Sequence, residues 1–234
     1  MNEIWDRVTN AQPVPDLRVV LVTGAVAVVL VLHGPTWRFC RQAVTIVHEG
    51  GHALVAVLAG RSLGGVRLHR DSSGVTTHRG VARGPGMIAT MAAGYPAPAL
   101  LGLIGAFVLG QGYAVGLLWL LLLVLALLIV AIRNWFGLWV VLVSGGALFA
   151  VTWWAPGDWQ VAFAHGLVWF LLLAAPMTVV ELAHQRRHRR GAASSDADQL
   201  GRATWLPGWS WVGLFFLFDV GCLALGGALL LGRL

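Results

Sequence analysis

Long apolar runs separated by short polar segments form the dominant pattern of this chain. A transmembrane helix needs about 20 mostly apolar residues to cross the hydrocarbon core. Because the segments between the third, fourth and fifth runs are so short, those helices must be antiparallel neighbours. The pattern predicts an all-α polytopic membrane protein of six or seven transmembrane helices in a single domain, residues 1–234. The runs lie at Leu17–Leu32, Pro35–Ala59, Pro85–Leu109, Tyr113–Ile132, Trp135–Trp154, Trp159–Leu182 and Gly208–Leu231.

Two polar segments are too long to be simple turns. In residues 61–83, Val66 and Leu68 alternate with polar positions, and Ser72 to Gly74 form a turn signal. Alternation followed by such a turn predicts a short β-hairpin. Residues 183–207 are first basic and then small and polar, which predicts a flexible cytoplasmic loop with a short helical stretch near Asp198.

The composition agrees with a membrane location. Of 234 residues, 58% are hydrophobic and 11% are charged, whereas soluble domains are about 45–50% apolar and about 25% charged. We therefore expect the lipid bilayer to cover much of the surface. The two cysteines, Cys40 and Cys222, have no metal-ligand spacing and predict packing residues. Met1 to Asp16 is polar and mixed in charge, which does not match a cleavable signal peptide.

The net charge of +6 comes without any lysine. The Arg residues lie between apolar runs, so the positive-inside rule explains them better than nucleic-acid binding does. With seven spans and a cytoplasmic N-terminus, every Arg except Arg38, Arg41 and Arg233 lies on the cytoplasmic side. We therefore expect a multi-pass protein of the plasma membrane with its N-terminus and both polar segments in the cytoplasm.

The second apolar run contains the sequence His48-Glu49-Gly50-Gly51-His52. Residues four apart lie on one face of a helix, so the two imidazoles can occupy two corners of a zinc tetrahedron. Glu49 projects close to the same face and can act as the base that accepts a proton from water. The bare backbone of the two glycines can admit a neighbouring helix or a substrate strand, or serve ordinary helix packing.

Ionisable groups within an apolar helix are expensive and mark function. The alternative is a polar seam that hydrogen-bonds to a neighbouring helix. A catalytic zinc usually has three protein ligands, so a third is needed. The cost of burial favours Asp219, inside the seventh run, while Asp196 and Asp198 lie just before that run and could turn back toward the site.

Other polar residues suggest weaker hypotheses. Glu181, His184 and His188 have helical spacing and could bind a metal, but their Arg-rich surroundings favour a charge cluster at the membrane surface. Asn134 begins the fifth run and is predicted to be an N-cap.

The motif and its surroundings resemble the site-2 protease family of intramembrane zinc metallopeptidases, and more narrowly its compact bacterial branch without a PDZ domain. The specific part is Val47 to Leu54, followed by Ala59-Gly60 and a hairpin-like stretch. Softer matching features run through most of the chain: Ala93-Gly94-Tyr95 with Gly102, Arg133-Asn134-Trp135-Phe136-Gly137, and Ser195-Asp196-Ala197 followed by Leu200, Thr204, Pro207 and Trp211.

The resemblance implies zinc-dependent hydrolysis of a peptide bond in or near a transmembrane segment of a membrane-protein substrate, often to release a membrane-tethered regulator. It implies that His48 and His52 are zinc ligands and that Glu49 is the catalytic base. The family's third ligand usually lies in an Asn-x-x-Pro-x-x-x-Leu-Asp-Gly segment. This sequence lacks that segment, and Asp196-Ala197 and Asp219-Val220-Gly221 are the nearest counterparts.

The predicted hairpin suggests how a substrate could be held. A helix satisfies its own backbone groups, whereas a protease needs an extended strand, which an exposed sheet edge can bind. We therefore hypothesise that residues 66–77, with Val66, Leu68 and Val75, clamp unwound substrate, against the alternative of a plain loop. Two other classes remain open: a membrane metal-binding or transport protein without catalysis, and an inactive protease-like scaffold.

Overall fold

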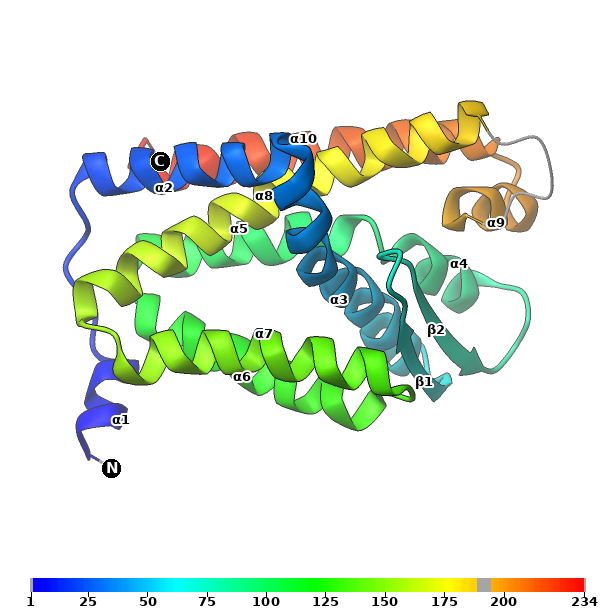
Figure 1. Ribbon diagram of the computed structural model, residues 1–234. Helices are drawn as coiled ribbons and strands as arrows, with labels where there is room; N and C mark the ends of the chain where they lie inside the picture. Colours follow the sequence, from blue (N-terminus) through cyan, green and yellow to red (C-terminus); the bar gives the residue numbers. More distant parts are fainter. Residues whose placement is uncertain (1, 189–194, 234) are drawn as a thin grey trace.

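The computed structural model describes residues 2–188 and 195–233 as ten helices and one two-stranded sheet (Figure 1). Most of the predicted flexible part of the basic loop, residues 189–194, lies outside the described residues. The elements are α1 (Asn2–Thr9), α2 (Leu17–Leu32), α3 (Gly34–Leu58), β1 (Ser62–Leu68), β2 (Gly74–Arg79), α4 (Pro85–Ala92), α5 (Pro96–Gly110), α6 (Ala114–Ala131), α7 (Trp135–Trp154), α8 (Gly157–His188), α9 (Asp196–Ala203) and α10 (Gly208–Leu230).

A helical bundle forms the body of the molecule. Helix α8 packs against α2, α5 and α10, and α6 packs against α7. Small residues allow the closest approach: a Cβ on Gly102 or Gly226 would lie within 3 Å of the Leu172 side chain. Leu172 belongs to the largest buried apolar cluster, together with Ala99, Ala106 and Leu118. The described residues thus confirm a mostly helical membrane fold with a small hairpin.

Three of the predicted spans form two bent helix pairs: the predicted spans Leu17–Leu32 and Pro35–Ala59 meet at one bend, and the predicted span Pro85–Leu109 contains the other. Helices α6, α7, α8 and α10 are each long and apolar enough to cross a membrane, whereas α2–α3 and α4–α5 qualify only as pairs bent by 100° and 70°. Proline explains both breaks, because Pro35 and Pro96 lie at the starts of α3 and α5 and cannot continue the preceding helix. The described helices therefore give four spans, or six if each bent pair counts as one.

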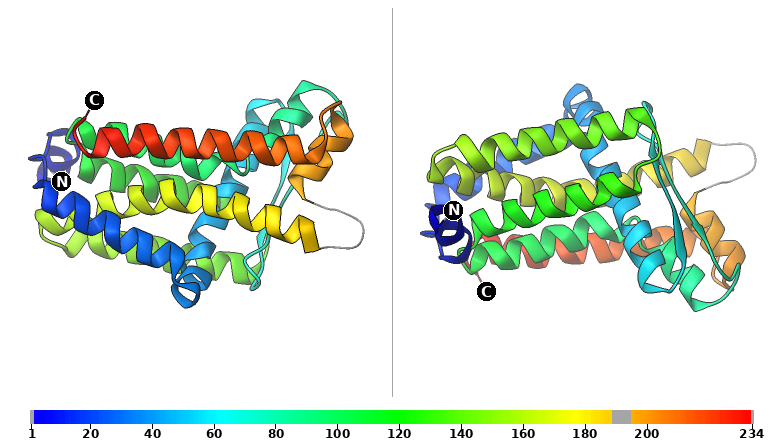
Figure 2. Two further views of the ribbon diagram at one scale, coloured as in Figure 1. Left: turned by 90° about the horizontal axis from the view of Figure 1, so that it is seen from above. Right: turned by 90° about the horizontal axis from the view of Figure 1, so that it is seen from below.

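The bend at α2–α3 changes the expected arrangement of the chain ends. We expected the N-terminal segment on the same side as the hairpin, with α3 as a span of its own. Instead, α1 and the end of α10 lie at one end of the bundle, and the hairpin, α4 and α9 lie at the other (Figure 2). The pattern of apolar residues records the length of a run and not its direction, which is why it missed the bend.

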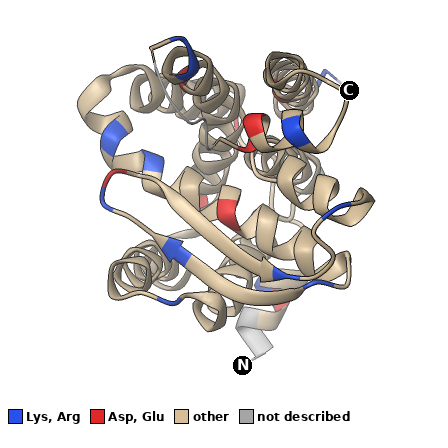
Figure 3. Ribbon diagram, turned by 90° about the vertical axis from the view of Figure 1, so that its right-hand side faces the viewer, with Lys and Arg blue, Asp and Glu red and all other residues tan. Residues whose placement is uncertain are grey.

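Most described Arg residues gather at the hairpin end of the bundle, which Figure 3 shows face-on. Arg7, Arg18 and Arg233 belong to the opposite end, and Arg38 and Arg41 lie in the first turns of α3, next to the bend. The residues at the hairpin end are Arg61, Arg67, Arg70, Arg79, Arg83, Arg133, Arg186, Arg187 and Arg202.

The hairpin is antiparallel and is fixed to the bundle along β1. Val66 pairs with Thr76 and Leu68 with Gly74. On the other edge of β1, the Arg133 N–H donates to the Val66 carbonyl at 2.9 Å. The Asn134 side chain accepts from the Leu68 N–H at 3.2 Å and donates to the Leu68 carbonyl at 2.7 Å. Asn134 does precede α7, but its side chain makes no cap hydrogen bond there, so it holds the hairpin instead.

Candidate metal centre

Helix α3 presents His48 and His52 side by side, as their spacing predicts. Their Nε2 atoms are 3.1 Å apart, and the two rings meet edge to face with centroids 4.7 Å apart. His52 is buried and His48 is half-buried. The two imidazoles therefore direct one nitrogen each toward a common point.

Asp196, the first residue of α9, completes the group from the other end of the chain. Its Oδ2 atom lies 3.2 Å from the Nε2 of His48 and 3.2 Å from the Nε2 of His52. These three side chains form a group that could hold a metal ion. Of the three aspartates considered as third ligand, Asp196 is therefore the one that lies beside both imidazoles.

The spacing of the three atoms fits zinc. With bonds of about 2.0–2.1 Å, two ligands of a tetrahedral zinc are about 3.3 Å apart, close to the 3.1–3.2 Å observed. Hydrogen bonding alone does not explain a triangle of nearly equal sides, because each N–H points at one acceptor. Two imidazoles and one carboxylate, with a fourth position left for water, are the donor set of catalytic zinc sites.

The surroundings of His52 and His48 fix the direction of their rings. The Nδ1 of His52 lies 2.7 Å from the Thr90 carbonyl oxygen, and such a contact leaves Nε2 free for a metal. The Tyr95 ring meets the His48 ring edge to face at 4.7 Å between centroids. A Cβ on Gly94 would lie 2.4 Å from His52 Nε2 and 2.6 Å from His48 Nε2, so bare backbone covers the ligand atoms on this side.

Burial and hydrogen bonding act in opposite directions on Asp196. Burial, the largest single cause, would raise the pKa of its carboxyl, but the hydrogen bonds and the charge attraction of His48 and His52 together outweigh burial and hold that pKa well below its usual value. The carboxylate is therefore ionised at neutral pH, which is the form that binds a metal.

Glu49 lies beneath the hairpin, on the same turn of α3. Its side chain is buried, with 4% of the residue exposed. The Thr76 hydroxyl donates to Glu49 Oε2 at 2.6 Å and also lies 3.1 Å from the Glu49 carbonyl oxygen. A Cβ on Gly74 would lie 2.5 Å from Glu49 Cγ and Oε1. Strand β2 therefore holds the predicted base in one orientation.

The other two candidate aspartates have different surroundings. Asp198 forms an ion pair with Arg186. Asp219 is fully buried in α10, and neither carboxylate oxygen has a hydrogen-bond partner among the described residues. The energetic cost of burying a charged group favoured Asp219 as third ligand. That argument correctly predicted that Asp219 is buried, but it could not predict which side chains surround it.

The remaining polar hypotheses resolve differently. Glu181 pairs with Arg41 at 3.0 Å and accepts from the Trp37 indole N–H at 2.6 Å. The rings of His184 and His188 contact each other at a tilt of 54°, with centroids 4.3 Å apart. Within residues 2–188 and 195–233, His48, His52 and Asp196 are the only group of three or more His, Cys, Asp or Glu side chains close enough together to share a metal ion.

The glycines of the motif have separate environments. A Cβ on Gly51 would lie 2.5 Å from the Ala97 Cβ and 2.9 Å from the Ala93 carbonyl oxygen, whereas nothing lies within 4 Å of the equivalent position on Gly50. Gly51 therefore lets the junction of α4 and α5 approach α3, which is how Gly94 reaches the ligand atoms.

The hairpin residues suggested for substrate binding divide into two groups. Val66 and Leu68 are fully buried in a cluster with Ile46, Ala53 and residues of α6 and α7, so in this structure they anchor the hairpin and cannot contact a substrate. Val75 is 47% exposed on the opposite face of the sheet.

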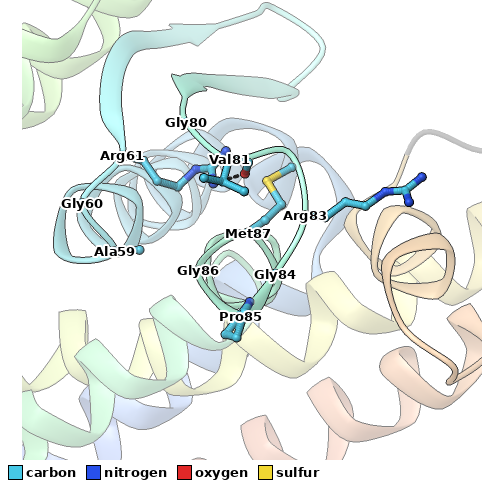
Figure 4. Close-up of a pocket in the computed structure, with 10 residues that line it drawn as sticks. All are labelled: Ala59, Gly60, Arg61, Gly80, Val81, Arg83, Gly84, Pro85, Gly86 and Met87. Atoms are coloured by element: carbon cyan, nitrogen blue, oxygen red, sulfur yellow. Dashed lines mark hydrogen bonds between the residues drawn. The ribbon is translucent and has the colours of Figure 1, made fainter.

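A cavity of about 400 Å³ lies beside the hairpin, between the end of α3 and the start of α4 (Figure 4). Arg61 crosses it to donate to the Val81 carbonyl at 2.7 Å, while Arg83 points away. None of the three ligand-forming residues lines this cavity, so it is separate from the metal centre.

Sequence reasoning missed Thr76, Gly74 and Gly94 as parts of the site. Strand periodicity offered a signal, because Gly74, Thr76 and His78 share one face of β2. Which face turns toward α3 depends on how β1 is anchored, and short motifs do not encode that.

Comparison with known protein families matches residues 21–226 to the family described as Peptidase M50B-like. The match covers most of the chain and includes every residue of the candidate metal centre. Comparisons with curated proteins and with solved structures return no match.

Proposed function

Because the chain belongs to the Peptidase M50B-like family, a group of membrane metallopeptidases of the site-2 protease type, we propose that it is a zinc-dependent endopeptidase that cleaves within or near transmembrane segments. The observation that carries this proposal is the triangle of His48 Nε2, His52 Nε2 and Asp196 Oδ2 with sides of 3.1–3.2 Å. The buried Glu49 on the same helical turn supplies the base that such a site requires.

The chemistry divides between the metal and the chain. Zinc, when bound by His48, His52 and Asp196, supplies Lewis acidity that polarises a carbonyl and makes water acidic near neutral pH. Glu49 accepts a proton from the water that attacks the carbonyl carbon and delivers it to the leaving amide nitrogen as the C–N bond breaks. Thr76 holds Glu49 in place during both transfers.

Strand β2 is the element best suited to hold an extended substrate. One of its edges pairs with β1, and no strand pairs with its other edge in the described part of the chain. A transmembrane helix must unwind before its backbone can be cleaved, and an open sheet edge can pair with the unwound segment. The exposed Val75 then contacts alternate substrate side chains. A membrane-tethered regulator is the class of substrate that we propose.

The distribution of Arg residues supports a proposal for the orientation of the protein in the membrane. By the positive-inside rule, the hairpin end of the bundle faces the cytoplasm. If the two bent pairs each cross the bilayer once, α1 and the end of α10 then face the opposite side. This orientation replaces the cytoplasmic N-terminus expected from seven spans.

The experiment that tests the function uses the full chain purified in detergent without chelators. Zinc content is measured, and cleavage of a model transmembrane peptide is compared with that by Glu49→Gln. We expect bound zinc in both proteins and cleavage by the parent alone. Zinc without cleavage by the parent would favour a metal-binding or transport protein, and absence of zinc would favour an inactive scaffold.

A further inference from the structure

Asp196, the proposed third ligand, lies on helix α9, which is too short to be stable as an isolated helix. Helix α9 has eight residues, and isolated helices of that length are unstable in water. Asp196 is its first residue, so the position of the carboxylate depends on whatever fixes the start of α9. The inference below rests on the metal centre proposed above.

Apolar contacts hold α9 against the bundle. Ala197 and Leu200 are fully buried in a cluster with Met91, Val212 and Phe215. Burial of Ala197 and Leu200 sets which face of α9 meets the bundle, but because apolar burial is non-directional it does not by itself hold the Asp196 carboxylate within bonding distance of the two imidazoles. A directional contact is needed for that.

Arg186, near the end of α8, supplies such contacts on both sides of Asp196. Its Nη1 atom donates to the Ser195 hydroxyl oxygen at 3.2 Å and forms an ion pair with Asp198 Oδ1. Ser195 is the N-cap of α9 and also hydrogen-bonds to the Asp198 side chain. One guanidinium therefore holds both Ser195, immediately before Asp196, and Asp198, two residues after it.

The guanidinium is itself enclosed. The side chains of Arg186 and Asp198 are 14% and 12% exposed, and the Arg186 guanidinium lies over the Trp209 ring at 5.1 Å from its centroid. A Cβ on Gly208 would lie 2.7 Å from Arg186 Nη2 and 2.9 Å from the Ala197 carbonyl oxygen. Arg186 thus joins α8, α9 and the start of α10 at one point.

From this arrangement we propose that Arg186 is a positioning residue for the metal centre: its contacts with Ser195 and Asp198 orient α9 so that Asp196 reaches His48 and His52. Polar groups that orient metal ligands change affinity by about 10-fold to 100-fold when they are removed. Arg186 would act in this way through two residues that flank the ligand.

The test measures zinc affinity of the full chain by competition with a chelator. Arg187→Gln is the matched control, because Arg187 is exposed and lies over the same Trp209 ring at 6.0 Å. We expect Arg186→Gln to lower zinc affinity about 10-fold or more, Arg187→Gln to leave it near the parent value, and Arg186→Lys to restore part of the loss.

A double variant separates orientation from general destabilisation. If Arg186 and Asp198 act as one unit, the double variant Arg186→Gln with Asp198→Asn loses no more zinc affinity than the single variant that binds zinc less tightly. The melting temperature of the zinc-free proteins is measured alongside, and we expect the increase on adding zinc to shrink in Arg186→Gln.

Two results would overturn the proposal in distinguishable ways. If the parent binds zinc no more tightly than Arg186→Gln does, Arg186 has no positioning role, and the proposed metallopeptidase function still stands. A parent protein that binds no zinc removes the metal centre and the role of Arg186 with it.

Discussion

At the scale of single residues, Gly94 tests whether the two imidazoles share a metal. Because a Cβ there would lie 2.4 Å from His52 Nε2, we expect Gly94→Ala to displace the ligand atoms and lower zinc affinity by about 10-fold or more. Gly50→Ala is the control, since its Cβ meets nothing within 4 Å. Equal zinc affinity in the two variants, measured by chelator competition, would contradict the site.

Thr76 tests how Glu49, the proposed catalytic base, is held. Removing a hydrogen bond to a charged group costs about 1.5–3 kcal/mol, so Thr76→Val should lower kcat by about 10-fold to 100-fold. Zinc content and KM should stay near the parent values, and Thr76→Ser should keep most of the activity. A parent-like kcat in Thr76→Val would show that the 2.6 Å contact with Glu49 has no role in turnover.

At the scale of elements, Asn134 joins the hairpin to the bundle through both backbone groups of Leu68. We expect Asn134→Ala to weaken this attachment by about 1–3 kcal/mol, and amide hydrogen exchange in residues 66–76 to become faster. Asn134→Asp keeps the acceptor and should be intermediate. Unchanged exchange in Asn134→Ala would mean that Val66 and Leu68 hold the hairpin without it.

The helices and the hairpin also show which features of the fold could be predicted from the sequence. The bounds of α2 and α7 and the position of the hairpin follow from apolar runs and turn residues alone. The break before Pro35 was predicted as a turn between two full spans, and the break before Pro96 lay within one continuous apolar run. Asp196 could be proposed as a ligand but not chosen, because its distance from His48 depends on how α9 packs against α4 and α10.

At the scale of the whole molecule, the bent α2–α3 pair determines which chain ends share a side of the membrane. With Cys40 and Cys222 replaced, a single cysteine at Asn10 and another at Ser72 should be labelled by membrane-impermeant reagents from opposite sides, with Ser72 accessible from the cytoplasm. Labelling of both from the cytoplasm would restore the seven-span arrangement.

The central claim is that His48, His52 and Asp196 hold one metal ion, and zinc content tests it most directly. The matched variants are Asp196→Asn and Asp219→Asn, which remove one carboxylate each without changing side-chain size. We expect about one zinc per chain in the parent and in Asp219→Asn, and little in Asp196→Asn. Zinc retained by Asp196→Asn, or lost from Asp219→Asn alone, would contradict the account.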